Sequence, residues 1–213
     1  MFLIISCTPL QPKGNLEYTI INNKSIFEYK TELETYTTIN ELRKKNIDFV
    51  AYKDYSVGSI RLLNSEDLNN CTNCLDKFSI FLLWEENEIE YLQIFDNCGN
   101  FYPVKLINRD ILKFTKQNLE TLNAERVKFY QENKNTVVLT YHSRFKKFLI
   151  SVKDREIYNY FDTYNLKSNS EKPNLNYLFN QNLKLIRLNS MIEDEIKIQN
   201  ELNNFKRDLT ECR

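Results

Sequence analysis

Glycine, alanine and histidine are scarce in this 213-residue chain, and the scarcity excludes several classes of site. Only three glycines occur, all isolated, so no loop has the several glycines with which backbone N–H groups converge on a phosphate. The single histidine, His142, leaves few schemes for acid–base catalysis or metal binding. No apolar run approaches the roughly 20 residues that cross a bilayer as a helix. We therefore predict no cofactor and no bound metal, and we find no catalytic signature.

Neither sign of charge is in excess. Lys and Arg total 29, as do Asp and Glu, so the formal net charge is zero. Domains that bind nucleic acid are usually basic overall. The sharpest basic patch, Arg144-Phe145-Lys146-Lys147, is short, and we interpret it as a solvated turn. We expect no nucleic-acid partner.

Asparagine is abundant, with 28 residues against two alanines. Together with many Lys, Ile, Tyr and Phe residues, this is the composition that AT-rich codons produce. The aromatic residues are then assigned mainly to the core rather than to a binding face.

The first residues combine a short apolar run with a small residue and a cysteine. Ile4-Ile5-Ser6-Cys7 resembles the lipobox of bacterial lipoproteins. The resemblance implies that Cys7 is lipidated, that it begins the mature protein, and that the protein is anchored in the cell envelope. Secretory signals normally start with a positive charge and a longer apolar run, so the alternative is that Phe2–Ile5 is a first β-strand of a cytoplasmic protein.

We divide the chain into three segments. Residues 1–7 form a truncated signal segment that resembles a lipobox, and residues 8–24 form a tether and entry segment. Residues 25–210 are long enough for a single α+β domain.

The domain is predicted to contain an antiparallel meander sheet, at about residues 78–107, packed against two or three helices. Its clearest signal is a pair of apolar runs, Phe78–Trp84 and Ile89–Phe95, around a short acidic turn. Helices are predicted over 25–45 and 110–133, with a long C-terminal helix over 182–209. Further strands are predicted over 48–52, 57–63, 101–107, 136–141 and 148–152, with a turn at 53–56; residues 156–166 fit either a strand or a helix.

Five cysteines are present. The spacing of Cys71 and Cys74 occurs in zinc and redox sites, but no second closely spaced ligand pair accompanies it. In a hairpin centred between Glu86 and Asn87, Cys74 lies opposite Cys98, close to the roughly 5.5 Å between Cα atoms that a disulfide requires. We predict a Cys74–Cys98 disulfide, with Cys71 as a competitor for Cys98. Such a bond persists in an oxidising compartment.

Carboxylates are plentiful but not organised into a motif. Glu85, Glu86 and Glu88 cluster at the hairpin tip and are candidate partner-binding residues. The run Glu193-Asp194-Glu195 is predicted to be the exposed face of the last helix. We expect a non-enzymatic, lipid-anchored protein that acts by binding a protein partner, a toxin-immunity protein being one version. The alternative is an extracytoplasmic hydrolase with a site built from scattered carboxylates.

Overall fold

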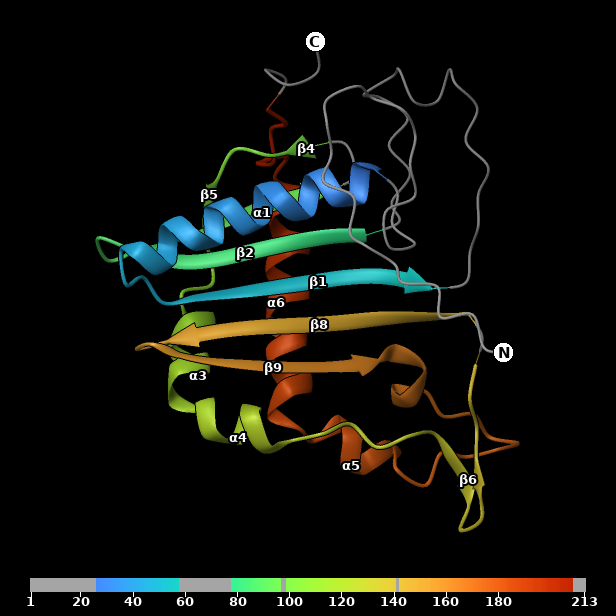
Figure 1. Ribbon diagram of the computed structural model, residues 1–213. Coiled ribbons are helices and arrows are strands. Elements are labelled where there is room, and N and C mark those ends of the chain that lie inside the picture. The colour runs from blue at the N-terminus through green and yellow to red at the C-terminus, as the bar shows by residue number, and fades with distance from the viewer. Residues whose placement is uncertain (1–25, 58–77, 97–98, 141, 209–213) are drawn as a thin grey trace, which may run out of the picture.

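The computed structural model describes residues 26–57, 78–96, 99–140 and 142–208, and it has the α+β fold predicted from the sequence (Figure 1). The helices are α1 (Ile26–Lys44), α3 (Asp110–Gln117), α4 (Leu119–Ala124), α5 (Tyr177–Gln181) and α6 (Lys184–Glu201), with a 3-10 helix, η1, at Thr163–Leu166. The strands are β1 (Phe49–Val57), β2 (Phe78–Glu86), β3 (Ile89–Asp96), β4 (Gly99–Asn100), β5 (Val104–Lys105), β6 (Gln131–Asn133), β7 (Thr136–Val137), β8 (Ser143–Val152) and β9 (Arg155–Asp162).

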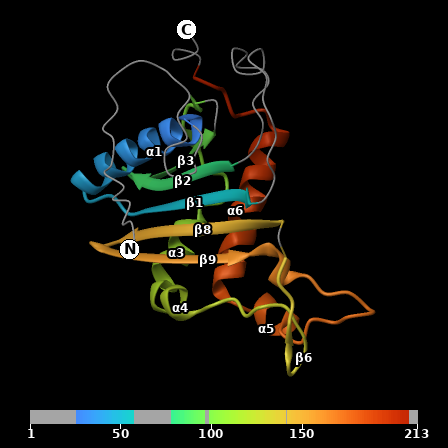
Figure 2. The same ribbon diagram turned by 45° about the vertical axis from the view of Figure 1, so that its right-hand side comes forward.

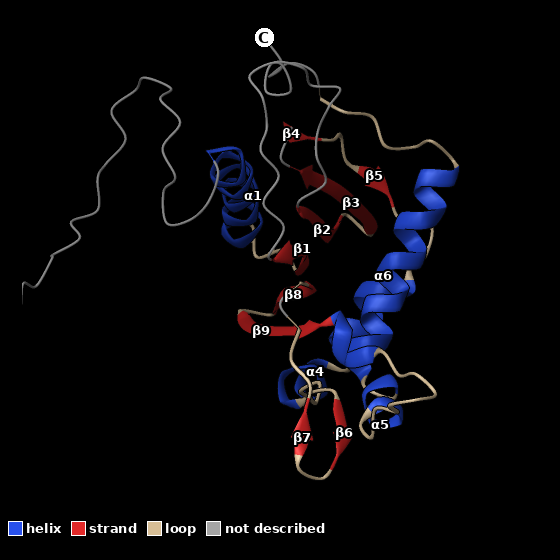
Figure 3. Cartoon of the chain, turned by 90° about the vertical axis from the view of Figure 1, so that its right-hand side faces the viewer, coloured by secondary structure: helices blue, strands red, loops and turns tan. Residues whose placement is uncertain are grey.

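The centre of the molecule is a seven-stranded antiparallel sheet in the order β4-β3-β2-β1-β8-β9, with β5 also paired to β3. Helix α1 lies on one face of the sheet and α6 on the other (Figure 3). Helices α3 and α4 contribute to the same core as α6. A separate two-stranded ribbon, β6–β7, projects beyond one end of this arrangement (Figure 1).

Two hydrophobic cores follow from the alternation of side chains along each strand. In β1, the fully buried Phe49 packs on the α1 side of the sheet, and the next residue, Val50, packs on the α6 side. The larger core lies on the α6 side and includes Leu185 and Ile192 of that helix. Apolar side chains are therefore buried on both faces of the sheet.

The predicted hairpin at residues 78–95 is confirmed as β2–β3. Its turn residues, Asn87 and Glu88, have φ angles of 53° and 62°. Positive φ at both central positions is typical of a type I′ turn, whose twist matches that of a hairpin. Because Glu86 pairs with Ile89, the centre lies one residue later than predicted, between Asn87 and Glu88.

The prediction of two strands separated by a turn at residues 53–56 is wrong. The chain continues as one strand, β1, through Val57. Its polar residues are accommodated because each has a partner: Lys53 binds Glu32 at 2.5 Å, and Asp54 binds Arg144. The remainder of the second predicted strand lies outside the described residues.

The helix predicted over 110–133 is shorter and broken. Asn118, with φ −116° and ψ 16°, separates α3 from α4, and its side chain donates to the carbonyl of Phe114. The chain becomes extended at Glu125. An asparagine side chain competes with the helical backbone for hydrogen bonds to nearby N–H and C=O groups. Asparagine is therefore favoured at helix ends.

The long C-terminal helix is confirmed, but α6 ends at Glu201 rather than near residue 209. Asn203 has a φ of 52°, and the N–H groups of Asn203 and Asn204 donate to the carbonyls of Asn200 and Gln199. This pattern is a Schellman motif. The following residues run back to the sheet, where Arg207 forms a β-bridge with Phe101.

Three further strand predictions need correction. The strand expected over 101–107 is limited to β5, directly after Pro103, because proline cannot donate to a ladder. The strand expected over 136–141 is reduced to β7. Residues 143–147, expected to link two strands, belong to the long strand β8, and the ambiguous segment 156–166 forms β9 and η1.

Candidate functional site

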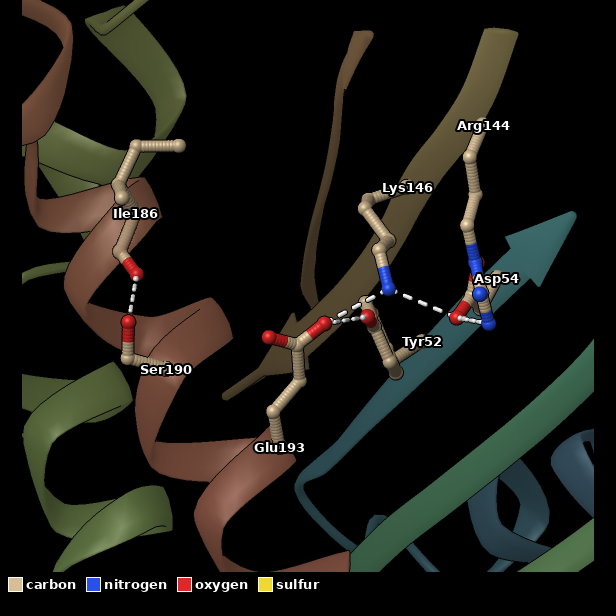
Figure 4. Close-up of polar contacts among 7 residues, drawn as sticks. All are labelled: Tyr52, Asp54, Arg144, Lys146, Ile186, Ser190 and Glu193. Atoms are coloured by element: carbon tan, nitrogen blue, oxygen red, sulfur yellow. Dashed lines mark hydrogen bonds and ion pairs between the residues drawn. The ribbon is translucent and has the colours of Figure 1, made fainter. Parts of the chain in front are cut away.

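A cluster of charged side chains lies between the sheet and α6 (Figure 4). It combines Tyr52 and Asp54 from β1, Arg144 and Lys146 from β8, and Glu193 from α6. The register of the sheet brings it together, since Asp54 is paired directly with Lys146 across the β1–β8 ladder.

Lys146 is the centre of the cluster. Its Nζ lies 2.7 Å from Asp54 Oδ2 and 2.7 Å from Glu193 Oε1, and its side chain is only 6% exposed. Arg144 adds two parallel bonds to Asp54, at 2.6 Å from Nε and 2.5 Å from Nη2. Two carboxylates and two cations therefore balance one another at the edge of the larger core. A buried ion needs such partners to offset its lost hydration.

Tyr52 completes the cluster. Its hydroxyl donates to Glu193 Oε1 at 3.1 Å. Burial raises the pKa of the Tyr52 phenol, and the negative charge of Glu193 raises it further. The phenol therefore remains a hydrogen-bond donor at physiological pH. The cluster fastens α6 to the sheet, and it reaches solvent through Arg144 and Glu193, whose side chains are 62% and 46% exposed.

Two sequence predictions about these residues are wrong. Arg144-Phe145-Lys146-Lys147 is not a solvated turn, because it lies inside β8 and Lys146 is buried. Glu193 and Asp194 are exposed on α6 as predicted, but Glu195 is not. It is fully buried, and its carboxylate accepts the backbone N–H groups of Ile107 and Asn108, both at 2.9 Å.

Sequence reasoning also missed the links from Asp54 and Glu193 to Lys146. One signal was present: Arg144 and Lys146 continue the two-residue alternation of Phe148 and Ile150 along β8. Extending that pattern backwards would have placed both cations on the face that packs against α6.

A groove of about 240 Å³ opens on the other face of the sheet, between α1 and β9. Its floor includes Ile39, Ala51, Ile80 and Leu149. Tyr36 and Tyr158 also line it and are 57% and 65% exposed. Helix α1 lies over the β2–β3 side of the sheet (Figure 2). The side chains of Tyr158 and Tyr160 of β9 are correspondingly exposed, at 65% and 62%. We call this the α1–β9 groove.

The candidate partner-binding glutamates lie at the tip of β2–β3, as predicted. Glu85 Oε2 is 2.7 Å from Lys116 Nζ, and Glu86 Oε1 is 3.0 Å from Lys45 Nζ. Glu88 occupies the turn and is exposed. Two of the three carboxylates are therefore already paired with cations of the same domain.

Glu90 is the unusual carboxylate of this hairpin. It is paired directly with Glu85 across the ladder. Burial raises the pKa of Glu90 to about 7, and the negative charge of Glu85 contributes. Within the described part of the chain, its Oε2 atom is buried without a hydrogen-bond partner.

All five cysteines lie outside the described residues. Lipidation of Cys7 and the Cys74–Cys98 disulfide, with Cys71 as the competitor, therefore remain predictions. Within the ranges that the structure describes, no group of three or more His, Cys, Asp or Glu side chains is placed to hold a metal ion. No helix in those ranges has the length and apolar character needed to cross a membrane.

Comparison of the chain with protein-family models, with curated proteins and with solved structures found no match.

Proposed function

We propose that the protein is a lipid-anchored binding protein of the bacterial cell envelope, attached through Cys7, which recognises a protein partner with the α1–β9 groove. The anchor rests on the likeness of Ile4-Ile5-Ser6-Cys7 to a lipobox. The recognition surface rests on one observation: a sheet face left half covered, with an apolar floor and exposed tyrosines around it.

The size of the groove favours a protein over a small molecule. Pockets for drug-sized ligands occupy roughly 300–1,000 Å³, and the groove holds about 240 Å³. That space suits one protruding apolar side chain of a partner. Buried anchor side chains of this kind supply most of the affinity in protein interfaces.

The residues around the groove support the same proposal. Tyr36 and Tyr158 are large and amphipathic, and tyrosine is enriched where proteins bind one another. Lys147 also lines the groove and adds a positive charge beside the apolar floor. A partner that presents an apolar side chain next to an acidic one would complement this surface. A delivered toxin neutralised by an immunity protein is one version of such a partner.

The anchor is tested by expressing the native reading frame in its own host. Mass spectrometry of the N-terminus should find an acylated Cys7, and globomycin should block its processing. The Cys7→Ser variant should lose the lipid. An unprocessed Met1 in soluble cytosolic protein would contradict the anchor.

The recognition surface is tested with a partner captured from native envelopes and then purified. The double variant Tyr36→Ala/Tyr158→Ala should weaken its binding by about tenfold or more, because truncating a central tyrosine typically costs over 1 kcal/mol. Tyr102→Ala, a similarly exposed tyrosine at the far edge of the sheet, is the matched control. Equal affinity of both variants would show that the partner does not use the groove.

A further inference from the structure

One end of the molecule carries a lobe made of two segments, residues 126–140 and 163–182. The first contains the β6–β7 ribbon and the second contains α5, and the views agree that these elements lie side by side (Figures 1 and 3). Backbone and side-chain bonds join them: Leu175 N–H donates to the carbonyl of Gln131, and Asn176 Nδ2 donates to that of Phe129. We call this unit the basic lobe.

The basic lobe exposes several large apolar side chains. Leu139 and Leu178 are the most exposed, at 75% and 73%. The full set is Phe129, Val137, Leu139, Leu175, Tyr177, Leu178 and Phe179. Exposed apolar side chains that are gathered in one region mark an interaction site, whereas single ones do not.

The same lobe is positively charged. It contains five cations (Arg126, Lys128, Lys134, Lys167 and Lys172) and two acids (Glu132 and Glu171), a net charge of +3 in a chain whose formal charge is zero. All five cations are exposed, and Glu132 is paired with Lys172 at 3.5 Å. Lys128 Nζ lies 3.9 Å from the ring centre of Phe179, so cationic and apolar groups are interleaved.

Buried asparagine side chains hold the backbone of the lobe in place. Asn180 is fully buried, and its Nδ2 donates to the carbonyls of Lys128 and Asn165. Asn174 Nδ2 donates to the carbonyls of Asn165 and Lys167. These bonds join the backbones of the two segments in the interior of the lobe.

We propose that the basic lobe binds the surface of an anionic phospholipid membrane, inserting its leucine and phenylalanine side chains between the headgroups. Phe and Leu beside Lys and Arg are the composition of interfacial membrane-binding elements. Four of the five cations are lysines, which are depleted at protein interfaces but attracted to anionic lipid. The lobe thus suits a membrane, whereas the α1–β9 groove suits a protein.

This inference extends the proposed lipid anchor. A single acyl chain gives marginal membrane binding, and stable attachment needs a second signal such as a basic patch. The lobe would supply that signal and would orient the domain on the bilayer, with the α1–β9 groove away from the lipid-binding residues.

The test uses the full chain carrying Cys7→Ser, so that no acyl group contributes. Co-sedimentation with phosphatidylcholine vesicles containing about 30% phosphatidylglycerol should show binding that weakens as salt is raised. Vesicles of phosphatidylcholine alone should bind much less. Removal of two positive charges, with Lys134→Gln and Lys167→Gln, should weaken binding to the anionic vesicles.

Apolar insertion is tested separately with Leu139→Ser/Leu178→Ser, which should weaken vesicle binding by about tenfold, since each leucine loses its burial in lipid. Leu33→Ser/Leu202→Ser changes two exposed leucines elsewhere and should leave binding unchanged. Unchanged circular dichroism confirms that each variant is folded.

Absence of vesicle binding, equal binding to neutral vesicles, or equal loss in both leucine pairs would overturn the proposal. A partner protein whose capture is lost with Leu139→Ser/Leu178→Ser, without vesicle binding, would assign the lobe to protein recognition. Acylation of Cys7 is measured independently, so the lobe and the anchor can fail separately.

Discussion

Where the chain leaves helix or strand, buried asparagine side chains supply the hydrogen bonds that other backbone groups would otherwise make. Asn180 Oδ1 accepts the N–H of Lys128, while its Nδ2 donates to two carbonyls. An asparagine side chain offers one acceptor and two donors, so it can complete three such bonds. The abundance of asparagine has a genomic explanation, but individual asparagines stabilise this fold.

We predict that Asn180→Ala destabilises the protein by about 2–3 kcal/mol, because it leaves the backbone N–H and carbonyl of Lys128 without their side-chain partner and removes one of the two donors to the carbonyl of Asn165. Hydrogen exchange should show the amide of Lys128 losing protection first. Asn182→Ala is the matched control, since Asn182 is exposed and bonds only within its own turn. Equal effects of the two variants would argue against the role given to Asn180.

Lys146 is predicted to be the most sensitive residue of the charged cluster. Lys146→Met keeps much of the side-chain volume but leaves Asp54 and Glu193 without their shared cation, at a cost of about 3–5 kcal/mol in unfolding free energy. Tyr52→Phe removes one hydrogen bond and should cost about 1 kcal/mol. Urea denaturation at neutral pH measures both. A Lys146→Met variant as stable as Tyr52→Phe would mean that the pair with Arg144 suffices for Asp54.

Glu90 is predicted to make stability depend on pH. Its pKa in the folded protein is about 7, above its ordinary value of 4.5, so the folded state holds the proton more tightly. Stability should therefore decrease as the pH rises from about 4.5 to 7, where the unfolded chain has released a proton that the folded chain retains. Glu90→Gln should raise stability by about 1 kcal/mol above pH 8, after allowance for solvent screening, and change it little near pH 4. Thermal unfolding at the two pH values measures this difference. A stabilising effect of the same size at both would rule out titration as its cause.

Among the elements, the hairpin β2–β3 and the last helix could be predicted from the sequence because their signals are local. The apolar runs and the acidic turn of the hairpin lie within twenty residues. Strand β1 was wrongly divided into two because the polar residues Lys53 and Asp54 suggested a turn. Their charged partners, Glu32 and Arg144, are distant in sequence, so the local pattern gave no sign of them.

The alternation along β8 could place Arg144 and Lys146 on the α6 face, but their pairing with Asp54 could not be predicted, for the same reason. Asp54 and Lys146 are separated by 92 positions, and only the β1–β8 register brings them together. No spacing rule links residues that far apart. The α1–β9 groove likewise depends on where α1 rests on the sheet, which the pattern of a single helix does not determine.

The predicted Cys74–Cys98 disulfide would close the open end of the β2–β3 hairpin, outside the described residues. The last pair of the ladder is Ser79 with Asp96, so Cys74 and Cys98 lie five and two positions beyond it along the chain and are not directly opposite in the observed register. Oxidised protein should yield one tryptic peptide pair linked through Cys74 and Cys98. The bond would close a loop of about 25 residues and contribute roughly 3 kcal/mol.

Cys98→Ser should therefore lower the melting temperature of oxidised protein by several degrees, whereas Cys212→Ser should leave it unchanged. Thermal unfolding with and without reductant makes the measurement. Free thiols at both Cys74 and Cys98 after oxidation would contradict the bond, and a link between Cys71 and Cys98 would assign it to the competing cysteine.

At the scale of the whole molecule, the two proposed binding surfaces lie apart from the charged cluster that stabilises the fold. The α1 face holds the proposed recognition groove, the opposite face holds the larger core with its charged cluster, and one end holds the basic lobe (Figures 1 and 2). Because the cluster fastens α6 to the sheet, substitutions there should disturb stability before they disturb recognition.

The position of β1 in the middle of the sheet also constrains how the protein is made. One of its neighbours, β2, follows soon after it, but the other, β8, is complete only at Val152. A chain emerging from the ribosome or from a secretion channel would therefore carry β1 with an unpaired edge while the next hundred or so residues are delivered. Unpaired apolar edges invite aggregation. In an exported form, the sheet could be completed only after β8, and so most of the chain, had crossed the membrane.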